Sequence, residues 1–294
     1  MKKLFASAIA LMSFGFAYSQ ANVDVSTQLG NGNSAVIHQT GASNNNSLLQ
    51  QGNTNQATVD QTGTLNDNLA VSQGNNNKID VDQVGLLNEN DVLQQGNNNN
   101  AKTDQNGIWN TTYQRQWGNG NTATSMQSGI FNEAYQYQLG NNNQAMTTQS
   151  GLANYSYQAQ VGNGNWATSV QSGNFNTALQ EQFGNSNYAN ASQNGDDNFA
   201  WQTQQGNSNQ ASHIQAGDDN YADSWQVGNN NITSGQQYGN NNDLYQYQTG
   251  NGNRAYDLQS GNNNYIGVMQ TGTNHYHSGM QVGNNNSITT IQSN

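Results

Sequence analysis

The stretch QLGNNNQAMTTQ, residues 138–149, contains the unit that decides the fold of this 294-residue chain. In it Gly140 follows a glutamine by two residues and precedes Asn143 by three, and a second glutamine stands 11 residues after the first. The glycine recurs every 11 residues from Gly30 to Gly283, which is 23 consecutive steps. A fixed short period over nearly the whole chain predicts a stack of repeats rather than an ordinary globular domain.

The glutamine and the asparagine keep the same period. Glutamine recurs at every eleventh position from 28 to 292 except at Ser72, and asparagine from 33 to 286 except at His275. Hydrophobic residues make up only 32% of the chain and charged residues 8%, while proline is absent. Disordered polar chains are usually rich in proline, whereas the interior of a hydrogen-bonded ladder cannot accept it. The composition therefore favours an ordered stack held by backbone and amide hydrogen bonds.

The first residues differ from the rest. Two lysines precede a short apolar run that ends at Phe16, and Ala17 and Ser19 are small residues at the positions expected before a cleavage site. Residues 1–19 are therefore predicted to be a secretory signal peptide, cleaved near Ser19 and Gln20. Residues 20–25 form a short N-terminal segment, and residues 26–294 form the repeat domain.

The charge of the exported chain excludes one class of partner. Removal of the signal takes two of the 6 basic residues and none of the 17 acidic ones, so the net charge becomes 4 − 17 = −13. An acidic exported chain is not expected to bind nucleic acid. Cysteine is absent, so disulfides play no part in the fold.

The spacing within a unit predicts its local structure. Asn143, Ala145, Thr147 and Gln149 are two residues apart, which puts them on one face of a strand of about seven residues. The four residues around the glycine form the turn, where glycine provides a positive φ. Asparagine directly follows the glycine mostly in alternate turns, so two non-equivalent strands make one 22-residue rung.

These features predict an all-β fold, a two-sheet cross-β solenoid of about 12 stacked strand-turn-strand repeats, on the order of 55–60 Å long at ~4.8 Å per rung. Buried amides are tolerated when each one bonds to the identical residue in the neighbouring rungs. The expected core ladders include Gln116, Gln127, Gln138, Gln149, Gln160, Gln171 and Gln182, with Asn121, Asn132, Asn143, Asn154 and Asn165. The expected turn glycines include Gly118, Gly129, Gly140, Gly151 and Gly162.

The variable inward position indicates two facing sheets of different composition. One strand set carries long side chains there (Gln114, Gln136, Gln158, Gln180, Gln202 and Gln246), and the other carries short ones (Thr103, Ser125, Thr147, Ser169 and Ala191). Long side chains facing short ones are what close packing requires. Near the N-terminus the same positions are aliphatic.

The unit Gln-x-Gly-x-x-Asn-x-Ala-x-x-x-Gln resembles the curlin repeat of curli fibre subunits, both in QLGNNNQAMTTQ and in QVGNGNWATSVQ, residues 160–171. Curlins are exported bacterial proteins that polymerise outside the cell into functional amyloid for the biofilm matrix, adhesion and aggregation. The resemblance implies a self-assembling chain at the bacterial cell surface. It also implies three kinds of partner: a nucleator subunit, a curli export channel and chaperones.

The ends of the repeat domain suggest how such a chain assembles. Only residues 20–25 precede the repeats, and the last strand is still in register two residues from the C-terminus. Solenoids that stay soluble need polar caps at their ends. We therefore expect head-to-tail addition of identical copies into a fibre. Two alternatives are a curli nucleator subunit and a soluble β-solenoid that binds surfaces or glycans.

Aromatic residues gather on the outward face of one strand set. They are Tyr113, Tyr135, Tyr137, Tyr155, Tyr157, Trp201 and Tyr245. Stacking within the sheet explains them. A lateral surface for fibril bundling or adhesion is the alternative.

Other polar residues offer weaker candidates. Asp60, Asp82 and Asp104 form an outward column, which is either a solvated face or a means of slowing premature assembly. A further acidic cluster lies in two equivalent turns and consists of Asp196, Asp197, Asp218 and Asp219. We expect these side chains to be solvated turn residues, and a calcium site is the alternative. Inward-pointing His275 and His277 are expected to replace amides rather than to bind metal. The sequence contains no nucleophile–base set, metal-protease motif or phosphate loop. Its carboxylates are expected to point outward or to lie in turns rather than to pair in a cleft. We therefore expect neither an enzyme nor a cofactor.

Overall fold

The computed structural model describes residues 21–294, which form 25 β-strands and no helix. The predicted signal peptide, residues 1–19, lies outside the described residues. Among residues 21–294 there is thus no helix that could span a membrane. The strands are β1 Val23–Leu29, β2 Ser34–Ala42, β3 Asn45–Gln51, β4 Gln56–Thr64, β5 Asp67–Gln73, β6 Lys78–Leu86, β7 Glu89–Asn97, β8 Asn100–Ile108, β9 Thr111–Asn119, β10 Thr122–Ile130, β11 Glu133–Asn141, β12 Gln144–Leu152, β13 Tyr155–Asn163, β14 Trp166–Asn174, β15 Thr177–Phe183, β16 Tyr188–Asn194, β17 Phe199–Gln205, β18 Gln210–Ala216, β19 Tyr221–Asn229, β20 Ile232–Tyr238, β21 Asp243–Asn251, β22 Arg254–Ser260, β23 Tyr265–Thr273, β24 Tyr276–Val282 and β25 Ser287–Ser293.

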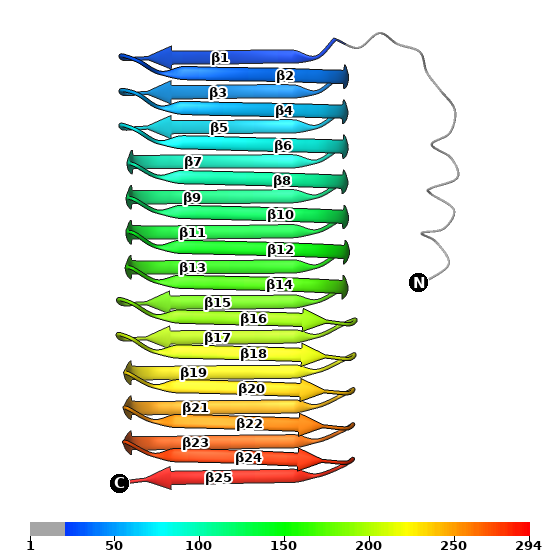
Figure 1. Cartoon of the computed structure of the whole chain (residues 1–294), viewed down its shortest axis with the longest axis vertical. Helices are drawn as coiled ribbons and strands as arrows, with labels where there is room; N and C mark the ends of the chain where they lie inside the picture. Colours follow the sequence, from blue (N-terminus) through cyan, green and yellow to red (C-terminus); the bar gives the residue numbers. More distant parts are fainter. Residues whose placement is uncertain (1–20) are drawn as a thin grey trace, which may run out of the picture.

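The strands form two parallel sheets (Figure 1). The odd-numbered strands make a 13-stranded sheet and the even-numbered strands a 12-stranded sheet, both in chain order. Each residue pairs with the residue 22 positions later, as Gln136 of β11 does with Gln158 of β13. The predicted two-sheet solenoid, its 22-residue rung and its about 12 rungs are confirmed. Strand β1 begins at Val23, so the ladder starts three residues before the predicted position 26.

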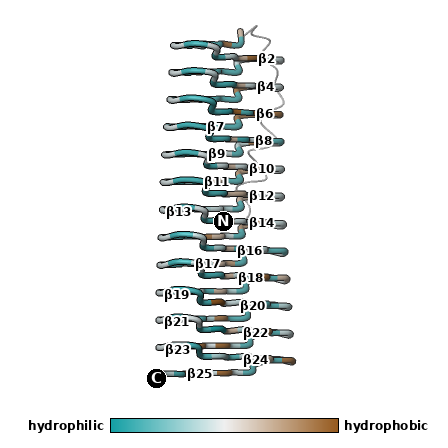
Figure 2. The backbone as a smooth tube through the Cα atoms, turned by 60° about the vertical axis from the view of Figure 1, so that its left-hand side comes forward, coloured by the Kyte–Doolittle hydropathy of each residue, from teal (hydrophilic) through white to brown (hydrophobic). Residues whose placement is uncertain are grey.

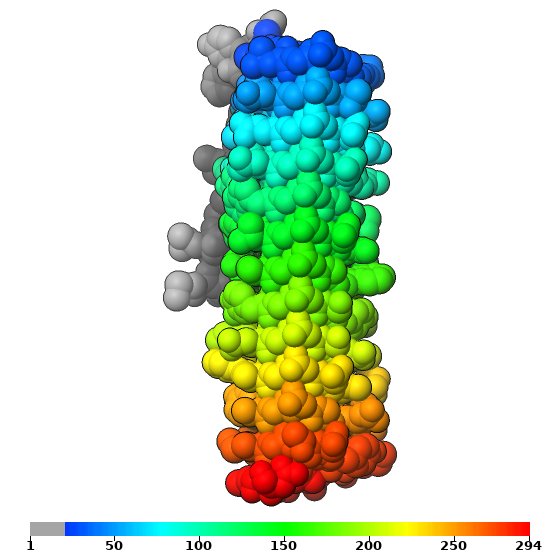
Figure 3. All heavy atoms as spheres, turned by 90° about the vertical axis from the view of Figure 1, so that its left-hand side faces the viewer, coloured from blue at the N-terminus to red at the C-terminus, as the bar shows by residue number. Residues whose placement is uncertain are grey.

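Side chains alternate between the interior and solvent, as the spacing of two predicts. In β12, Ala145, Thr147 and Gln149 are buried between the sheets, whereas Met146 points outward. Figure 2 shows the odd-numbered strands on one side of the stack and the even-numbered strands on the other, and Figure 3 shows that the stack is a straight column.

Every repeat glycine has a positive φ, between 105° and 142°, as predicted. Gly118, Gly129, Gly140, Gly151 and Gly162, predicted in turns, lie one residue before the ends of their strands, because the ladder continues past the glycine. The stack constrains these positions further than φ alone. A Cβ atom on Gly140 would lie 1.9 Å from the carbonyl oxygen of Gly162 in the next rung. Because this close approach repeats from turn to turn, no other residue fits.

Each turn also contains a second left-handed residue that the sequence analysis missed. It lies two positions after the glycine, as Asn142 and Ala153 do, both with φ 54°. Twenty of these positions are not glycine. The signal for it was the frequent asparagine at this position, since asparagine tolerates left-handed backbone better than most residues.

The interior has three zones along its length. The N-terminal zone is aliphatic and contains Leu48, Ala57, Val59, Ala70, Ile79, Val81, Val92 and Ala101. The central zone pairs inward glutamines with small residues, for example Gln136, whose amide lies 3.3 Å from the Thr147 hydroxyl across the interior. The C-terminal zone mixes histidine and aspartate with a second apolar cluster of Ala222, Leu244, Ala255, Ile266 and Val268. The predicted packing of long against short side chains is thus confirmed in the central zone.

Candidate functional site: amide ladders, end strands and the aromatic face

All predicted ladder glutamines are buried, none more than 2% exposed. Each donates a hydrogen bond to the next glutamine of its sheet, at 2.9 Å from Gln116 to Gln138 and from Gln138 to Gln160. Gln127, Gln149 and Gln171 form the equivalent ladder in the other sheet. The same Nε2 also donates across the interior, as Gln138 does to the Thr122 carbonyl at 2.9 Å. The ladders therefore join rungs and also tie the two sheets together.

The predicted ladder asparagines are buried too, but they form two different columns. In turns after even-numbered strands, the side-chain amide of Asn154 donates to the side-chain oxygen Oδ1 of Asn132 at 3.1 Å. In turns after odd-numbered strands, the Asn143 amide donates to the Gly162 carbonyl at 2.8 Å. In both columns Oδ1 accepts the backbone N–H of the next asparagine, as Asn121 does from Asn143 at 3.0 Å. Asn165 follows the same pattern.

The ladders have a direction. In the glutamine ladders each amide that bonds along its sheet donates to the residue 22 positions later, whereas the Asn132–Asn154 column donates to the residue 22 positions earlier. Within the described residues, the N-terminal end of the stack therefore presents the acceptor oxygens of Gln28 and Gln39. The C-terminal end presents the amide groups of Gln281 and Gln292. The two ends are complementary to each other, and neither is complementary to itself.

One ladder is interrupted where the sequence loses its period. Ser72 is fully buried in β5 and its hydroxyl has no partner within the described residues. The side-chain oxygen of Gln94, the next member of the ladder, is also unpaired. Within residues 21–294 the glutamine period fails at no other position, and this break leaves two polar atoms unsatisfied.

A third ladder lies on the surface, and the sequence analysis used its residues only to count strands. Asn141, directly after its glycine, donates to Asn163 at 2.9 Å, and the same pattern runs from Asn53 to Asn251. Figure 3 looks onto the turns that follow the odd-numbered strands, where this ladder runs.

The four clustered aspartates occupy equivalent turn positions after even-numbered strands. Asp196 accepts the backbone N–H of Asn174 at 2.8 Å, and Asp218 accepts that of Asp196 at 2.9 Å. Asp197 and Asp219 take the left-handed turn position, with φ 57° and 56°. Within residues 21–294 no three histidine or acidic side chains gather as a metal site would require. The aspartates serve the turn backbone.

The predicted aromatic residues lie together on the outer face of the 13-stranded sheet. Tyr113 and Tyr135 stack with ring centroids 5.0 Å apart, and Tyr155 lies 5.6 Å from Tyr135. Tyr137 and Tyr157 are 5.7 Å apart. Burial in this face, followed by the nearby Glu133 carboxylate, raises the pKa of Tyr135 to about 12.

The aromatic face is divided by strand β15, whose outward residues include Leu179 and Glu181. Trp201 and Tyr245 lie on its far side, where the ring centroids of Tyr221 and Tyr245 are 5.2 Å apart and the rings are tilted by 36°. The sequence predicts one aromatic surface, whereas β15 separates it into two parts. The apolar part near the C-terminus has a shallow hollow of about 330 Å³ lined by Tyr245, Tyr247, Tyr265, Met269 and Ile291, among others.

The interior near the C-terminus contains a chain of hydrogen bonds that the sequence analysis missed. His213 lies 2.6 Å from the Ser224 hydroxyl, which donates to Gln246 at 3.3 Å. Gln246 donates to Asp257 at 2.7 Å, and His277 lies 2.9 Å from the other oxygen of Asp257. Burial lowers the pKa of His213 to about 3, which keeps it neutral.

Asp257 contradicts the expectation that carboxylates lie only outward or in turns, because it is 4% exposed and points inward. Its position, four before Gly261, is the variable inward position, so the period could have shown this. His277 also points inward, as expected. His275 lies in the turn, where Nε2 reaches the Thr271 carbonyl at 3.1 Å, much as the ladder asparagines reach the carbonyl four residues before them. His275 therefore stands in the turn position that a ladder asparagine occupies in the other rungs.

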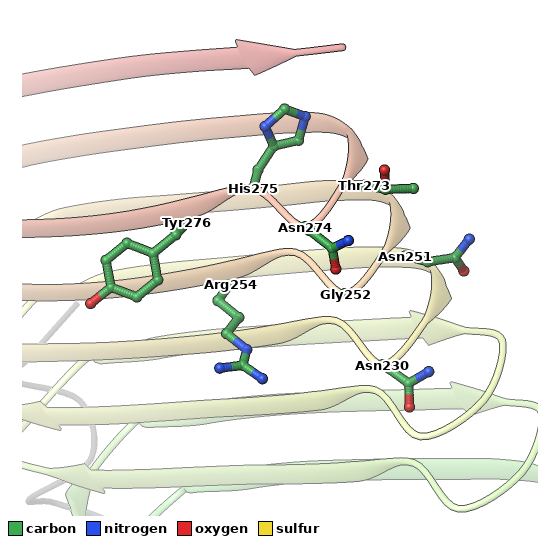
Figure 4. A pocket seen from close by; sticks show the side chains of 8 residues that line it. All are labelled: Asn230, Asn251, Gly252, Arg254, Thr273, Asn274, His275 and Tyr276. Carbon is green, nitrogen blue, oxygen red and sulfur yellow. The ribbon is translucent and has the colours of Figure 1, made fainter.

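A polar hollow of about 530 Å³ opens at the turns near the C-terminus (Figure 4). It arises where Gly252 interrupts a column of turn side chains between Asn230 and Asn274. Arg254 and Tyr276 border it, and Arg254 forms no ion pair with another described residue.

The acidic column on the 12-stranded sheet is confirmed as a stack, since Asp60, Asp82 and Asp104 are register partners. Lys102 is the register partner of Asp80, but the ion pair of Asp80 is with Lys78 at 3.9 Å. Burial, followed by repulsion from its acidic neighbours, raises the pKa of the Asp82 carboxyl.

The end strands are the most exposed parts of the stack. Strands β1 and β2 at one end, and β24 and β25 at the other, each have one edge without a strand partner among residues 21–294. Their outward apolar side chains are open to solvent, with Val25 59% exposed and Val282 and Ile291 each 72% exposed.

No protein-family model matches the chain. No curated protein matches it either. What the molecule does is therefore inferred from its own sequence and geometry.

Proposed function

We propose that this chain is an exported structural protein whose copies stack head to tail into cross-β fibres, the assembly that its resemblance to the curlin repeat implies. The fibres would lie outside the bacterial cell as curli-type functional amyloid of the biofilm matrix and mediate adhesion and aggregation. A repetitive structural or surface role is compatible with the solenoid itself. The finer assignment to curli, its nucleator, export channel and chaperones rests on the repeat alone.

The observation that carries the proposal is the complementarity of the two ends. Gln281 and Gln292 offer donors at one end, and Gln28 and Gln39 offer acceptors at the other. A second copy added head to tail continues both glutamine ladders, whereas a head-to-head contact places like groups together. An unpaired strand edge is itself a template for another strand. Such a heterologous contact does not close and so makes a filament.

The outer surface explains the adhesive part of the proposal. Most rings of this face are half-buried by their neighbours, but Trp201, Trp225 and Tyr265 are 36%, 50% and 39% exposed, and exposed apolar surface of this kind is typical of an interaction surface. Stacked copies would repeat this face along the fibre and present many weak contacts at once.

The first test compares freshly prepared and aged protein by size-exclusion chromatography. Conversion of monomer into material that elutes in the void volume and forms fibres under the electron microscope supports the proposal. A monomer that persists for days contradicts it and favours the second candidate, a soluble solenoid that binds glycans through its aromatic face. Substoichiometric protein that accelerates assembly of another curlin would identify a nucleator.

The second test removes single rungs. Deletion of residues 23–44 or 272–293 should slow elongation more than deletion of residues 133–154, because only the terminal rungs take part in the joint between copies. Equal elongation rates for all three deletions, followed by thioflavin fluorescence, would exclude growth from the ends.

A further inference from the structure

The two sheets have different numbers of strands, and this affects how copies can join. The stack begins with β1 and ends with β25, both in the 13-stranded sheet. If β1 of the next copy were placed on β25, the 12-stranded sheet would have an empty strand position between β24 and β2 of that copy. Two strand edges would then stay unpaired, at the cost of their backbone hydrogen bonds.

We propose that successive copies exchange sheets: β1 of the next copy pairs with β24, and β2 of the next copy pairs with β25. This inference rests on the proposed head-to-tail assembly and adds its register. The 11-residue period makes the exchange possible, because both sheets share the same order of inward glutamine and turn glycine. Every strand edge at the joint is then paired, and Gln281 and Gln292 are placed to donate to Gln28 and Gln39 of the next copy.

The interior residues at the two ends match in the exchanged register. Asp24 of the next copy is placed beside His277, whose other neighbour is the Asp257 carboxylate. Ala35 and Ile37 of the next copy, which border the N-terminal apolar zone, come to lie on β25 beside Ile288, which borders the C-terminal apolar cluster. The two apolar zones thereby become continuous.

The direct register matches poorly by comparison. With β1 of the next copy on β25, the Asp24 carboxylate is placed against Ile288 instead of against His277. Burial of a carboxylate against an apolar side chain is unfavourable, whereas burial beside a histidine allows an ion pair.

The outward residues agree with the same choice. In the exchanged register Leu29 of the next copy lies beside Val282, and Val23 lies beside Tyr276. These side chains are each about half exposed or more within a single copy: Leu29 52%, Val282 72%, Val23 49% and Tyr276 61%. In the direct register Leu29 and Val23 face Ser293 and Ser287 instead, so less apolar surface is removed from water.

The turn glycines give a further indication. A Cβ atom on any repeat glycine from Gly30 to Gly261 would lie about 2 Å from the carbonyl oxygen of the repeat glycine 22 residues later, but on Gly283 it would meet only Asn286, at 3.6 Å. In the exchanged register Gly30 of the next copy follows directly on Gly283 and supplies the missing turn. In the direct register that position stays empty.

The exchange has a visible consequence for the fibre. Each copy is rotated by half a turn relative to the one before it, so the aromatic face alternates between the two sides. At about 4.8 Å per rung, each copy adds about 60 Å to the length of the fibre. Because two copies are needed to complete a full turn, the structure repeats every ~120 Å along the fibre axis. Both sides of one fibre then carry aromatic patches.

The test uses cysteine pairs, because the chain has no cysteine of its own. The double variant Thr27→Cys with Met280→Cys places two outward thiols at neighbouring register positions in the exchanged joint, within the Cα distance that a disulfide needs. The matched variant Thr27→Cys with Ile291→Cys does the same for the direct joint. Each variant is assembled in reductant, its fibres are counted by electron microscopy, and its thiols are then oxidised with diamide. Within one chain the two sites lie at opposite ends, so only a contact between copies can join them.

Covalent oligomers on a non-reducing gel from Thr27→Cys with Met280→Cys, and monomer from the matched pair, are the expected result. Fibres that cross-link through Thr27→Cys with Ile291→Cys instead would overturn the exchange and leave the proposed fibre intact. Neither fibres nor cross-links from any variant, including the single-cysteine controls, would overturn both.

Discussion

Each interior glutamine bonds in two directions at once, along its own sheet and across to the other. Gln138 donates to Gln160 at 2.9 Å and to the Thr122 carbonyl at 2.9 Å. A buried amide without partners costs about 1–3 kcal/mol, so the length of the side chain and its register are both fixed by this geometry. Asparagine is too short to make both bonds, which explains why glutamine and asparagine hold separate columns.

Ser72→Gln should stabilise the protein by about 1–2 kcal/mol, because it satisfies the oxygen of Gln94 and removes an unpaired hydroxyl. The change is measured as a higher midpoint of guanidinium unfolding. Ser72→Ala serves as the control, since it removes the hydroxyl without restoring the ladder and should gain less. A lower midpoint for Ser72→Gln than for Ser72→Ala would mean that the ladder is not what stabilises this zone.

Gly140→Ala should destabilise the stack strongly, because its Cβ atom would lie 1.9 Å from the Gly162 carbonyl oxygen. Backbone strain alone costs about 1–3 kcal/mol. Gly164→Ala is the matched control, since its Cβ atom would have 3.8 Å to the nearest atom and Ala153 already occupies the same turn position elsewhere. Equal unfolding midpoints for the two variants would refute the role of the close turn packing.

At the scale of the elements, the two sheets share one interior but have different outer faces. The 13-stranded sheet carries the stacked aromatics, and the N-terminal part of the 12-stranded sheet carries the acidic column. Ring stacking and charge repulsion both act between neighbouring rungs, 22 residues apart. The sequence period therefore determines which outer side chains attract and which repel.

The acidic column should make stability depend on pH in a predictable direction. Burial and its acidic neighbours raise the pKa of Asp82 in the folded state, so its ionised form is disfavoured there. The resulting penalty is fully present above the folded pKa and disappears as the pH falls toward the unfolded value of about 3.9. Asp82→Asn should therefore be more stable than wild type at pH 7 and lose this advantage near pH 4.

The measurement is the guanidinium midpoint as a function of pH, with Glu181→Gln on the other sheet as the control. An Asp82→Asn advantage that grows toward acid would have the wrong sign and would exclude repulsion as the cause.

The aromatic face should control lateral association but not elongation. Replacing Tyr135, Tyr157 and Trp201 by serine removes two half-buried rings and one exposed ring from the outer face of one sheet, while the ladders stay intact. Electron microscopy should then show single fibrils in place of bundles. Replacing Trp166 and Tyr188 by serine, on the other sheet, is the control. Bundles that persist in the triple variant would leave only stacking within the sheet as the role of these rings.

At the scale of the whole molecule, the sequence predicted most of the fold because one period controls it. The glycine at every eleventh position, with Gln and Asn at fixed distances, determines strand length, turn position and the 22-residue rung. What it did not predict depends on atoms rather than on spacing. The second left-handed turn residue and the opposite directions of the ladders follow from contacts between rungs. The inward Asp257 is different, because its spacing of four from Gly261 already indicates an inward position.

The most direct test of the fibre proposal is X-ray diffraction from aligned, aged protein. If copies continue one stack, the meridian along the fibre axis should show a sharp reflection near 4.8 Å and the equator one near 10 Å. A protein that yields no fibres, or fibres whose ~4.8 Å reflection lies on the equator instead of the meridian, would contradict growth from the ends of the solenoid.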